Sequence, residues 1–139
     1  MPRSLLDTDI FSEVLKGVDP VVITRATEYR AVFGQYIIST ITVMEVVKGL
    51  HKVRREERIR QFLNILATVE LLVLDERSAE LAGRIFADLE RAGQPIGRAD
   101  PMVAAIAIQH GLTLVTGNTA HYERVRNLGY PLAIDNWRV

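Results

Sequence analysis

Short runs of apolar and β-branched residues alternate along this chain with longer segments of helical pattern, and no internal repeat or linker interrupts them. This order is typical of a parallel sheet whose strands are joined by crossover helices. Strands are expected at 3–6, 36–39, 70–74 and 113–116, with a weaker fifth strand at 131–134. Helices are expected at about 9–16, 20–33, 42–53, 55–67, 76–92, 100–110 and 119–127. We therefore predict an α/β fold in three layers, with a central parallel sheet of four to five strands and helices on both faces.

Length and composition narrow the kind of protein further. The 139 residues, 48% of them hydrophobic, suffice for one ordinary core, so residues 1–139 are expected to form a single domain. The absence of cysteine excludes disulfide scaffolds and thiolate metal sites, and it suits a cytoplasmic protein. The longest apolar run, Met102 to Ile108, is far shorter than the roughly 20 residues of a membrane span, and Asp7 and Asp9 interrupt any signal-peptide core. Because Lys and Arg balance Asp and Glu at 17 each, nucleic acid must be bound through local patches.

Acidic residues stand next to apolar runs at three places. Asp7 and Asp9 follow the first expected strand, Glu45 lies early in the helix after the second, and Asp100 opens the helix at 100–110. Ligands of open α/β sheets bind outside the carboxyl ends of the strands, where Asp7, Asp9 and, after the fourth strand, Asn118 are expected. If the fold brings these side chains together, they form an oxygen-rich pocket of the kind that binds Mg²⁺ or Mn²⁺ and hydrolyses phosphodiesters.

Local structure offers a competing explanation for each of these acids. Asp7 and Asp9 suit the N-cap and first turn of the following helix, and Asp100 before Pro101 suits a capped helix start. Glu45 lies opposite the apolar stripe of its helix, on a face that fits either solvent or the wall of a cleft. Periodicity and spacing leave both explanations open.

Six segments make the chain similar to a known family. They are 5–10 (LLDTDI), 41–46 (ITVMEV), 93–105 (GQPIGRADPMVAA), 110–119 (HGLTLVTGNT), 122–125 (YERV) and 135–137 (DNW). In their order and spacing they resemble the PIN-domain ribonucleases, specifically the VapC toxins of bacterial toxin–antitoxin pairs. The resemblance runs nearly end to end, and it implies a PIN-like fold and an endoribonuclease that depends on Mg²⁺ or Mn²⁺.

The resemblance also implies roles for the acids. The family's acidic site maps onto Asp7, Glu45 and Asp100, with Glu45 binding the metal directly or through water, and Asp9 stands at a variable position two residues after the first acid. Many PIN domains carry another Asp after the fourth strand, where this chain has Asn118. Its carbonyl oxygen can bind a metal but brings no charge, so a second tightly held metal is in doubt.

Residues that lie close to the acids in the sequence are candidate contacts for the substrate. Arg98 and Lys48 are candidate phosphate ligands, and solvated surface charge explains them equally well. Thr116, beside Asn118, is a further candidate, and His121 could orient a phosphate or shuttle a proton, or could simply be exposed at the start of a helix. The charged stretch from Lys52 to Arg60 favours a solvated face or a partner surface.

The partners implied by the resemblance are a structured RNA, a VapB-like antitoxin and a second copy of the chain. The RNA target implied first is tRNA, including initiator tRNA. We expect the antitoxin in a groove between the helices within 9–33 and 42–67, lined by Val14, Leu15, Val47, Leu50, Phe62 and Leu63. Core packing is the alternative for all six.

Two other classes of protein were considered. A phosphoaspartyl protein would also carry Asp residues at strand ends, but it needs a lysine late in the chain, and the last lysine here is Lys52. A non-catalytic PIN module that only binds RNA or an antitoxin would be favoured by loss of Asp7, Glu45 or Asp100, and all three acids are present.

Overall fold

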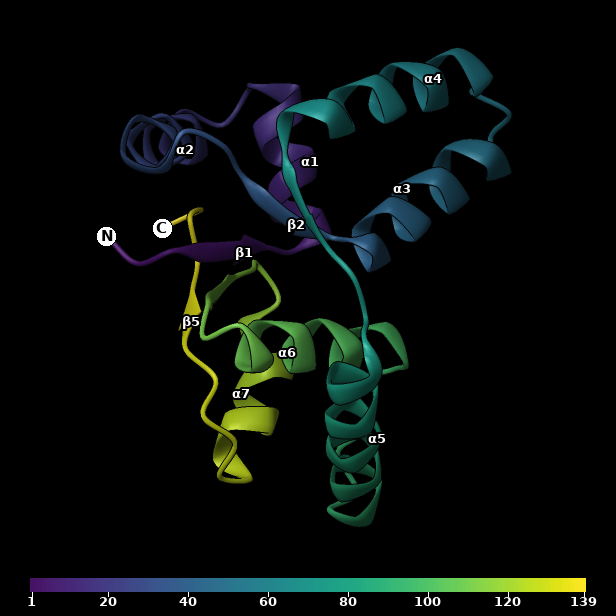
Figure 1. Cartoon of the computed structure of the whole chain (residues 1–139), viewed down its shortest axis with the longest axis vertical. Helices are drawn as coiled ribbons and strands as arrows, with labels where there is room; N and C mark the ends of the chain where they lie inside the picture. The colour runs from purple at the N-terminus through teal and green to yellow at the C-terminus, as the bar shows by residue number, and fades with distance from the viewer.

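The computed structural model describes all of residues 1–139, and its centre is a five-stranded parallel sheet (Figure 1). The strands lie in the order β3-β2-β1-β4-β5, so β1 is central. Their bounds are Ser4–Leu6 (β1), Ile37–Ser39 (β2), Glu70–Leu72 (β3), Thr113–Val115 (β4) and Ile134–Asp135 (β5). Every pairing is parallel, with Leu5 opposite Ile37 on one side and Leu114 on the other. The predicted α/β fold is confirmed.

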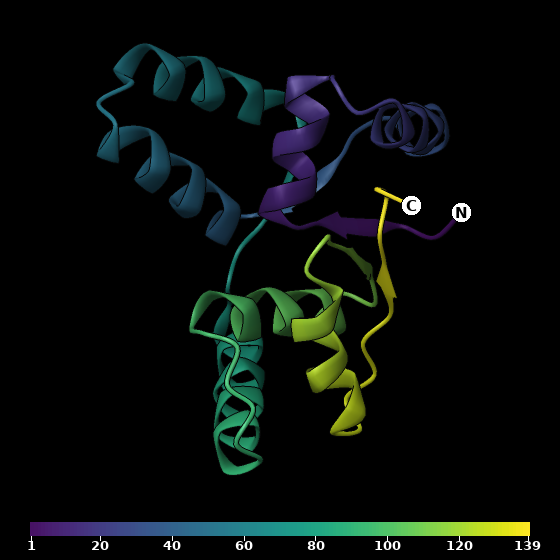
Figure 2. The same ribbon diagram turned by 180° about the vertical axis from the view of Figure 1, so that it is seen from behind.

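Helices cover both faces of the sheet. Figures 1 and 2 show α1 to α4 on one side of β1 and α5 to α7 on the other. Their bounds are Thr8–Lys16 (α1), Pro20–Phe33 (α2), Thr40–Lys52 (α3), Glu56–Ile65 (α4), Glu76–Arg91 (α5), Ala99–Gln109 (α6) and Thr119–Asn127 (α7), with a 3-10 turn at Leu66–Thr68. No helix is long and apolar enough to cross a membrane.

The strands divide the core into two parts, because successive side chains of a strand point to opposite faces. One face carries Leu5, Ile37 and Leu114, which pack with α5, α6 and α7. The opposite face carries Leu6, Ile38 and Val115, which pack with α1, α2 and Trp137. Helix α6 is apolar on all sides and is buried from Val103 to Ala107, as its composition predicts.

Three predicted boundaries are wrong for identifiable reasons. Helix α3 begins at Thr40, two residues early, because Ser39 caps it by accepting a hydrogen bond from the Thr42 amide. The last turn expected in α4 tightens into the 3-10 turn at Leu66–Thr68. The fifth strand starts at Ile134 rather than Pro131, because the Leu132 amide donates to the Tyr130 carbonyl and bends the chain there.

The connections between strands create one place where a ligand can enter. After β1 the chain passes into α1 on one face, whereas after the neighbouring β4 it passes into α7 on the other. Such a switch in direction leaves a crevice at the carboxyl ends of the two strands. Asp7 and Thr116 are the first residues after β1 and β4, so both lie at this crevice.

Candidate metal and phosphodiester site

Asp7 is the buried centre of the acidic cluster. Its side chain is only 7% exposed, at the end of β1 and at the N-cap of α1. Oδ1 accepts a hydrogen bond from the Thr8 amide at 2.9 Å. Oδ2 accepts from the Thr116 hydroxyl at 2.9 Å and from the Tyr122 hydroxyl at 3.2 Å. Asp7 therefore caps α1 and also contacts residues of the segment that follows β4.

The negative charge of Asp7 has no positive partner. The pKa of its carboxyl group is raised from 3.8 to about 6. Burial is the largest cause, followed by the negative charge of Asp9 and, to a smaller extent, that of Asp100. Hydrogen bonds from Thr8 and Thr116 oppose this increase only in part. No Lys, Arg or His forms an ion pair with Asp7. Asp7 therefore has no counter-ion within the chain.

Asp100 approaches Asp7 across the Tyr122 hydroxyl. Helix α6 begins at Ala99, so Asp100 lies inside its first turn and does not cap it; that part of the sequence interpretation is wrong. Tyr122 is fully buried, and the pKa of its phenol is raised well above 10 by burial and by the charges of Asp7 and Asp100. Its hydroxyl therefore stays protonated, donates a hydrogen bond to Asp7 and lies near Asp100.

His121 and Asn118 extend the cluster from the Asp100 side. The Nδ1 atom of His121 lies 3.0 Å from Oδ2 of Asp100 and 2.8 Å from the side-chain nitrogen of Asn118. The amide of Asn118 also donates to the Thr116 hydroxyl at 3.0 Å. These contacts hold His121 against Asp100 at the mouth of the pocket.

Glu45 joins the cluster through Thr8. The Thr8 hydroxyl donates to Oε1 of Glu45 at 2.6 Å and lies 2.9 Å from the hydroxyl of Thr42, which is buried. Glu45 is therefore held against the N-terminus of α1 rather than pointing freely into solvent. The hydrogen bond from Thr8 places this face of α3 next to α1.

Asp9 faces a different group of atoms. Its Oδ2 accepts a hydrogen bond from the Gly117 amide at 2.9 Å and lies 3.5 Å from Nη1 of Arg138. A Cβ atom at position 117 would lie 2.6 Å from Oδ2 of Asp9 and would collide with the Arg138 guanidinium, so a larger residue here would force both side chains to shift.

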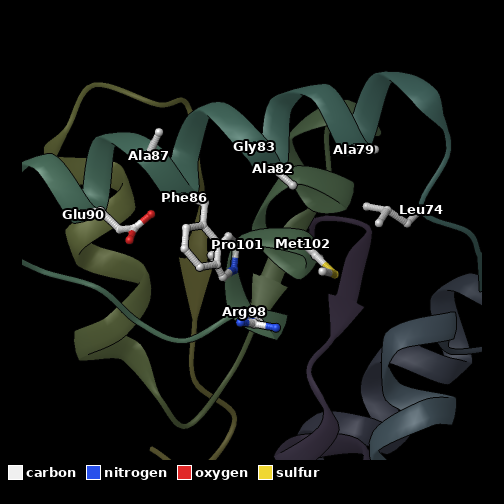
Figure 3. A pocket seen from close by; sticks show the side chains of 10 residues that line it. All are labelled: Leu74, Ala79, Ala82, Gly83, Phe86, Ala87, Glu90, Arg98, Pro101 and Met102. Carbon is white, nitrogen blue, oxygen red and sulfur yellow. The ribbon is translucent and has the colours of Figure 1, made fainter.

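Two predicted phosphate ligands lie apart from the cluster. Arg98 is exposed, forms no hydrogen bond with an acid and lines an apolar cavity of about 440 Å³ between α5 and α6, next to Pro101 and Met102 (Figure 3). Lys48 is also exposed and lines another cavity, with Met44 and Leu71. Neither basic residue is brought to the four carboxylates by a contact within this chain.

The fold agrees with comparisons to known proteins. The family model of the PIN domain matches residues 4–128. The chain belongs to the PIN-domain family. Among its relatives, the tRNA(fMet)-specific endonuclease VapC of Shigella flexneri is 33% identical over 129 residues, covering 92% of this chain and 96% of that protein. A ribonuclease VapC of Haemophilus influenzae is 32% identical over 138 residues, covering 99% of each chain.

Solved structures extend the same likeness. The DNA-bound VapBC complex of Salmonella typhimurium contains a chain that matches this PIN domain with a TM-score of 0.80 and 30% identity, over 99% of each chain. The VapBC2 complex of Rickettsia felis, bound to a promoter DNA fragment, matches with a TM-score of 0.80 and 27% identity over 96% of this chain and 98% of the other. The resemblance to VapC toxins seen in the sequence is confirmed.

PIN-domain nucleases generally use divalent metal ions, and the donors of this PIN domain suit a hard cation. No three His, Asp or Glu side chains converge into a protein-only metal cage. Mg²⁺ does not require one, since it usually keeps several waters and binds one or two carboxylates together with substrate phosphates. The uncompensated charge of Asp7, with Asp100 across the Tyr122 hydroxyl, fits this mode of binding.

Three members of the PIN-domain cluster were not found from the sequence: Thr8, Tyr122 and Arg138. Thr8 sits between two candidate acids, and its position in Asp7-Thr8-Asp9 is the only signal that could have drawn attention to it. Arg138 carries no local signal, because its partners Asp9 and Glu13 lie more than a hundred positions away in the chain. Tyr122 lies in the family-like segment 122–125, but nothing in that segment indicates its hydrogen bond to Asp7.

Proposed function

We propose that this PIN domain is an endoribonuclease toxin that depends on Mg²⁺, for which Mn²⁺ can substitute. The observation that carries the proposal is the buried, unpaired charge of Asp7 beside Asp100, at the carboxyl ends of β1 and β4. The relatives named VapC ribonucleases support the choice of RNA as substrate. Asp7, Glu45 and Asp100 are the proposed catalytic acids.

Each residue of the cluster has a role that follows from its contacts. Asp7 and Asp100 would hold the metal, while Thr116 and Tyr122 fix the Asp7 carboxylate. When bound, Mg²⁺ supplies positive charge at the scissile phosphate and makes water more acidic. The Thr8 hydroxyl orients Glu45, which is placed to bind the metal through a water molecule or to position the attacking water.

His121 is placed to exchange a proton at the mouth of the site. Its Nδ1 contacts Asp100, and imidazole is the side chain that changes charge most readily near neutral pH. In this scheme water attacks the phosphorus and the P–O3′ bond breaks, which leaves 5′-phosphate and 3′-hydroxyl ends, and the ribose 2′-hydroxyl takes no part. Preference for RNA then comes from its shape and from exposed loop bases.

The experiment that tests this function compares cleavage by the wild type with two isosteric variants. Purified protein is incubated with total bacterial RNA and Mg²⁺, and the new 5′ ends are sequenced. Asp7→Asn and Asp100→Asn should each abolish cleavage and growth inhibition while circular dichroism stays unchanged. Full activity of either variant at limiting Mg²⁺ would overturn the assignment. Absence of cleavage by the wild type would instead favour a non-catalytic binding module.

For the substrate, we propose tRNA, with initiator tRNA first. Support comes from the Shigella flexneri relative, whose name specifies tRNA(fMet), at 33% identity. The same cleavage assay on a panel of purified tRNAs tests the choice. Equal cleavage of all tRNAs, or cleavage confined to ribosomal RNA, would contradict it.

For the partner, we propose a VapB-like antitoxin that binds in the cytoplasm to a toxin homodimer. Support comes from the solved neighbours, which are VapBC complexes. A groove of about 390 Å³ opens between α1, α3 and α4, lined by apolar residues that include Leu15, Leu50 and Phe62. Phe62 is 4% exposed and lines this groove as part of the core, whereas Val14, Val47 and Leu63, which were also expected there, do not line it.

A further inference from the structure

The last residues of the chain are fastened to the core close to the acidic cluster. Trp137 is 2% exposed and packs among the core residues beneath α1 and α2. Arg25 holds the same segment from α2, through one bond to Asp135 at 2.9 Å and another to the carbonyl oxygen of Val139 at 2.6 Å. The backbone on both sides of Arg138 is therefore fixed.

This fastening delivers the Arg138 guanidinium to two carboxylates of α1. Nη1 lies 3.5 Å from Asp9 and Nη2 lies 3.4 Å from Glu13. Asp9 in turn accepts the Gly117 amide hydrogen bond, and residue 117 has no side chain to block the guanidinium. Among the four acids of the cluster, Asp9 alone is paired with an arginine or lysine.

We propose that Arg138 is an internal cation of the site and limits it to one divalent ion. Sites with two metals place the second ion about 3.5–4 Å from the first, where it needs carboxylates of its own. Here the guanidinium already neutralises Asp9 and repels a second cation. Asp9 is thereby a positioning residue that fixes the loop at Thr116–Asn118, and it leaves metal binding to Asp7 and Asp100. This inference rests on the proposed metal-dependent function.

Binding of Mn²⁺ to the full chain without RNA tests the inference. Electron paramagnetic resonance and calorimetry should count one ion per wild-type chain. Arg138→Ala should bind a second ion, or bind Mn²⁺ several-fold more tightly, because Asp9 loses its counter-ion. Arg138→Lys, which keeps the charge, should behave as the wild type. The double variant Arg138→Ala/Asp9→Asn should return to one ion, because the additional site requires the Asp9 carboxylate.

Arg25→Ala is the matched control. It loosens the same C-terminal segment without removing the charge at Asp9, so it should leave the count at one ion. The inference is overturned if Arg138→Ala binds Mn²⁺ as the wild type does, or if Arg25→Ala produces the same gain. Should Arg138→Ala fail to fold, Arg138→Gln replaces it, since it keeps length and polarity.

Failure of the inference is distinguishable from failure of the proposed function. A wild type that binds two Mn²⁺ ions, and loses binding and cleavage in Asp7→Asn, contradicts only the role of Arg138. A wild type that binds no Mn²⁺ and cleaves RNA equally well in a chelator contradicts metal dependence itself, and the inference with it.

Discussion

Replacing Asp7 by asparagine should stabilise the metal-free protein at neutral pH while it destroys the site. The carboxyl group has a folded-state pKa of about 6 against an ordinary 3.8, so the folded state holds its proton more tightly than the unfolded state does. Stability is therefore lost as pH rises from about 4 to 6 and is not regained above it. At about 1.4 kcal/mol per pKa unit, ionised Asp7 costs about 3 kcal/mol at pH 7.5.

Asparagine recovers only part of this energy. Its side-chain oxygen can still accept from the Thr8 amide, but that bond loses the strength given by a charged acceptor. The Thr116 and Tyr122 hydroxyls must rotate to accept from the new NH₂ group. We expect a net gain of about 1–2 kcal/mol, which corresponds to a rise of about 3–8 °C in Tm for a chain of this size.

Thermal unfolding in a chelator, at pH 4 and at pH 7.5, measures this effect. The difference in Tm between variant and wild type should be clear at pH 7.5 and small at pH 4. Adding Mg²⁺ should raise Tm of the wild type and leave that of the variant unchanged. Asp75→Asn is the matched control, because Asp75 also caps a helix after a strand, but its pKa is lowered by the Ser78 amide. It should lower Tm at pH 7.5 and lose this effect as pH falls. A Tm difference for Asp7→Asn that is equal at both pH values would refute the reasoning.

Three further substitutions test other parts of the structure. Gly117→Ala places a methyl group against Asp9 and Arg138. RNA cleavage should fall at least tenfold, and the unfolding free energy should fall by about 1–3 kcal/mol. A fully active variant would show that this close approach is unimportant. Trp137→Ala empties a core position and should cost about 3–5 kcal/mol in urea unfolding, a loss under 1 kcal/mol being incompatible with the packing described. Leu50→Glu in the groove should weaken antitoxin binding at least tenfold by calorimetry, whereas Met44→Glu, in a separate cavity, should not; equal effects would place the antitoxin elsewhere.

The sequence predicted those parts of the fold that depend on local pattern. Consecutive apolar residues, as at Leu5-Leu6 and Ile37-Ile38, predicted strands that the structure shows to be covered on both faces. Helix α2 begins and ends where expected, because Asp19 caps its start and Gly34, with a φ of 85°, ends it. Short strands next to proline, as at Pro131, were predictable only approximately, because pairing with β4 decides where β5 begins.

The candidate site was predictable only as far as its acids. Spacing could nominate Asp7, Glu45 and Asp100, and the resemblance to a family could group them. Neither the spacing nor the resemblance could identify the hydroxyl groups of Thr8 and Tyr122, which bind Glu45 and Asp7. A tyrosine on an amphipathic helix has the pattern of a core residue. The roles of Asp9 and Asp100 were similarly hidden, since both depend on where distant segments lie.

The central position of β1 also dictates when the pocket can come into existence. Its two neighbours are β2, which is made soon after β1, and β4, which is made more than a hundred residues after β1. Until residues 113–126 emerge, Asp7 has neither Thr116 nor Tyr122 beside it. A nascent chain therefore carries the first acid of the pocket without a pocket. The order of translation therefore delays formation of the pocket until β4 and α7 have been made.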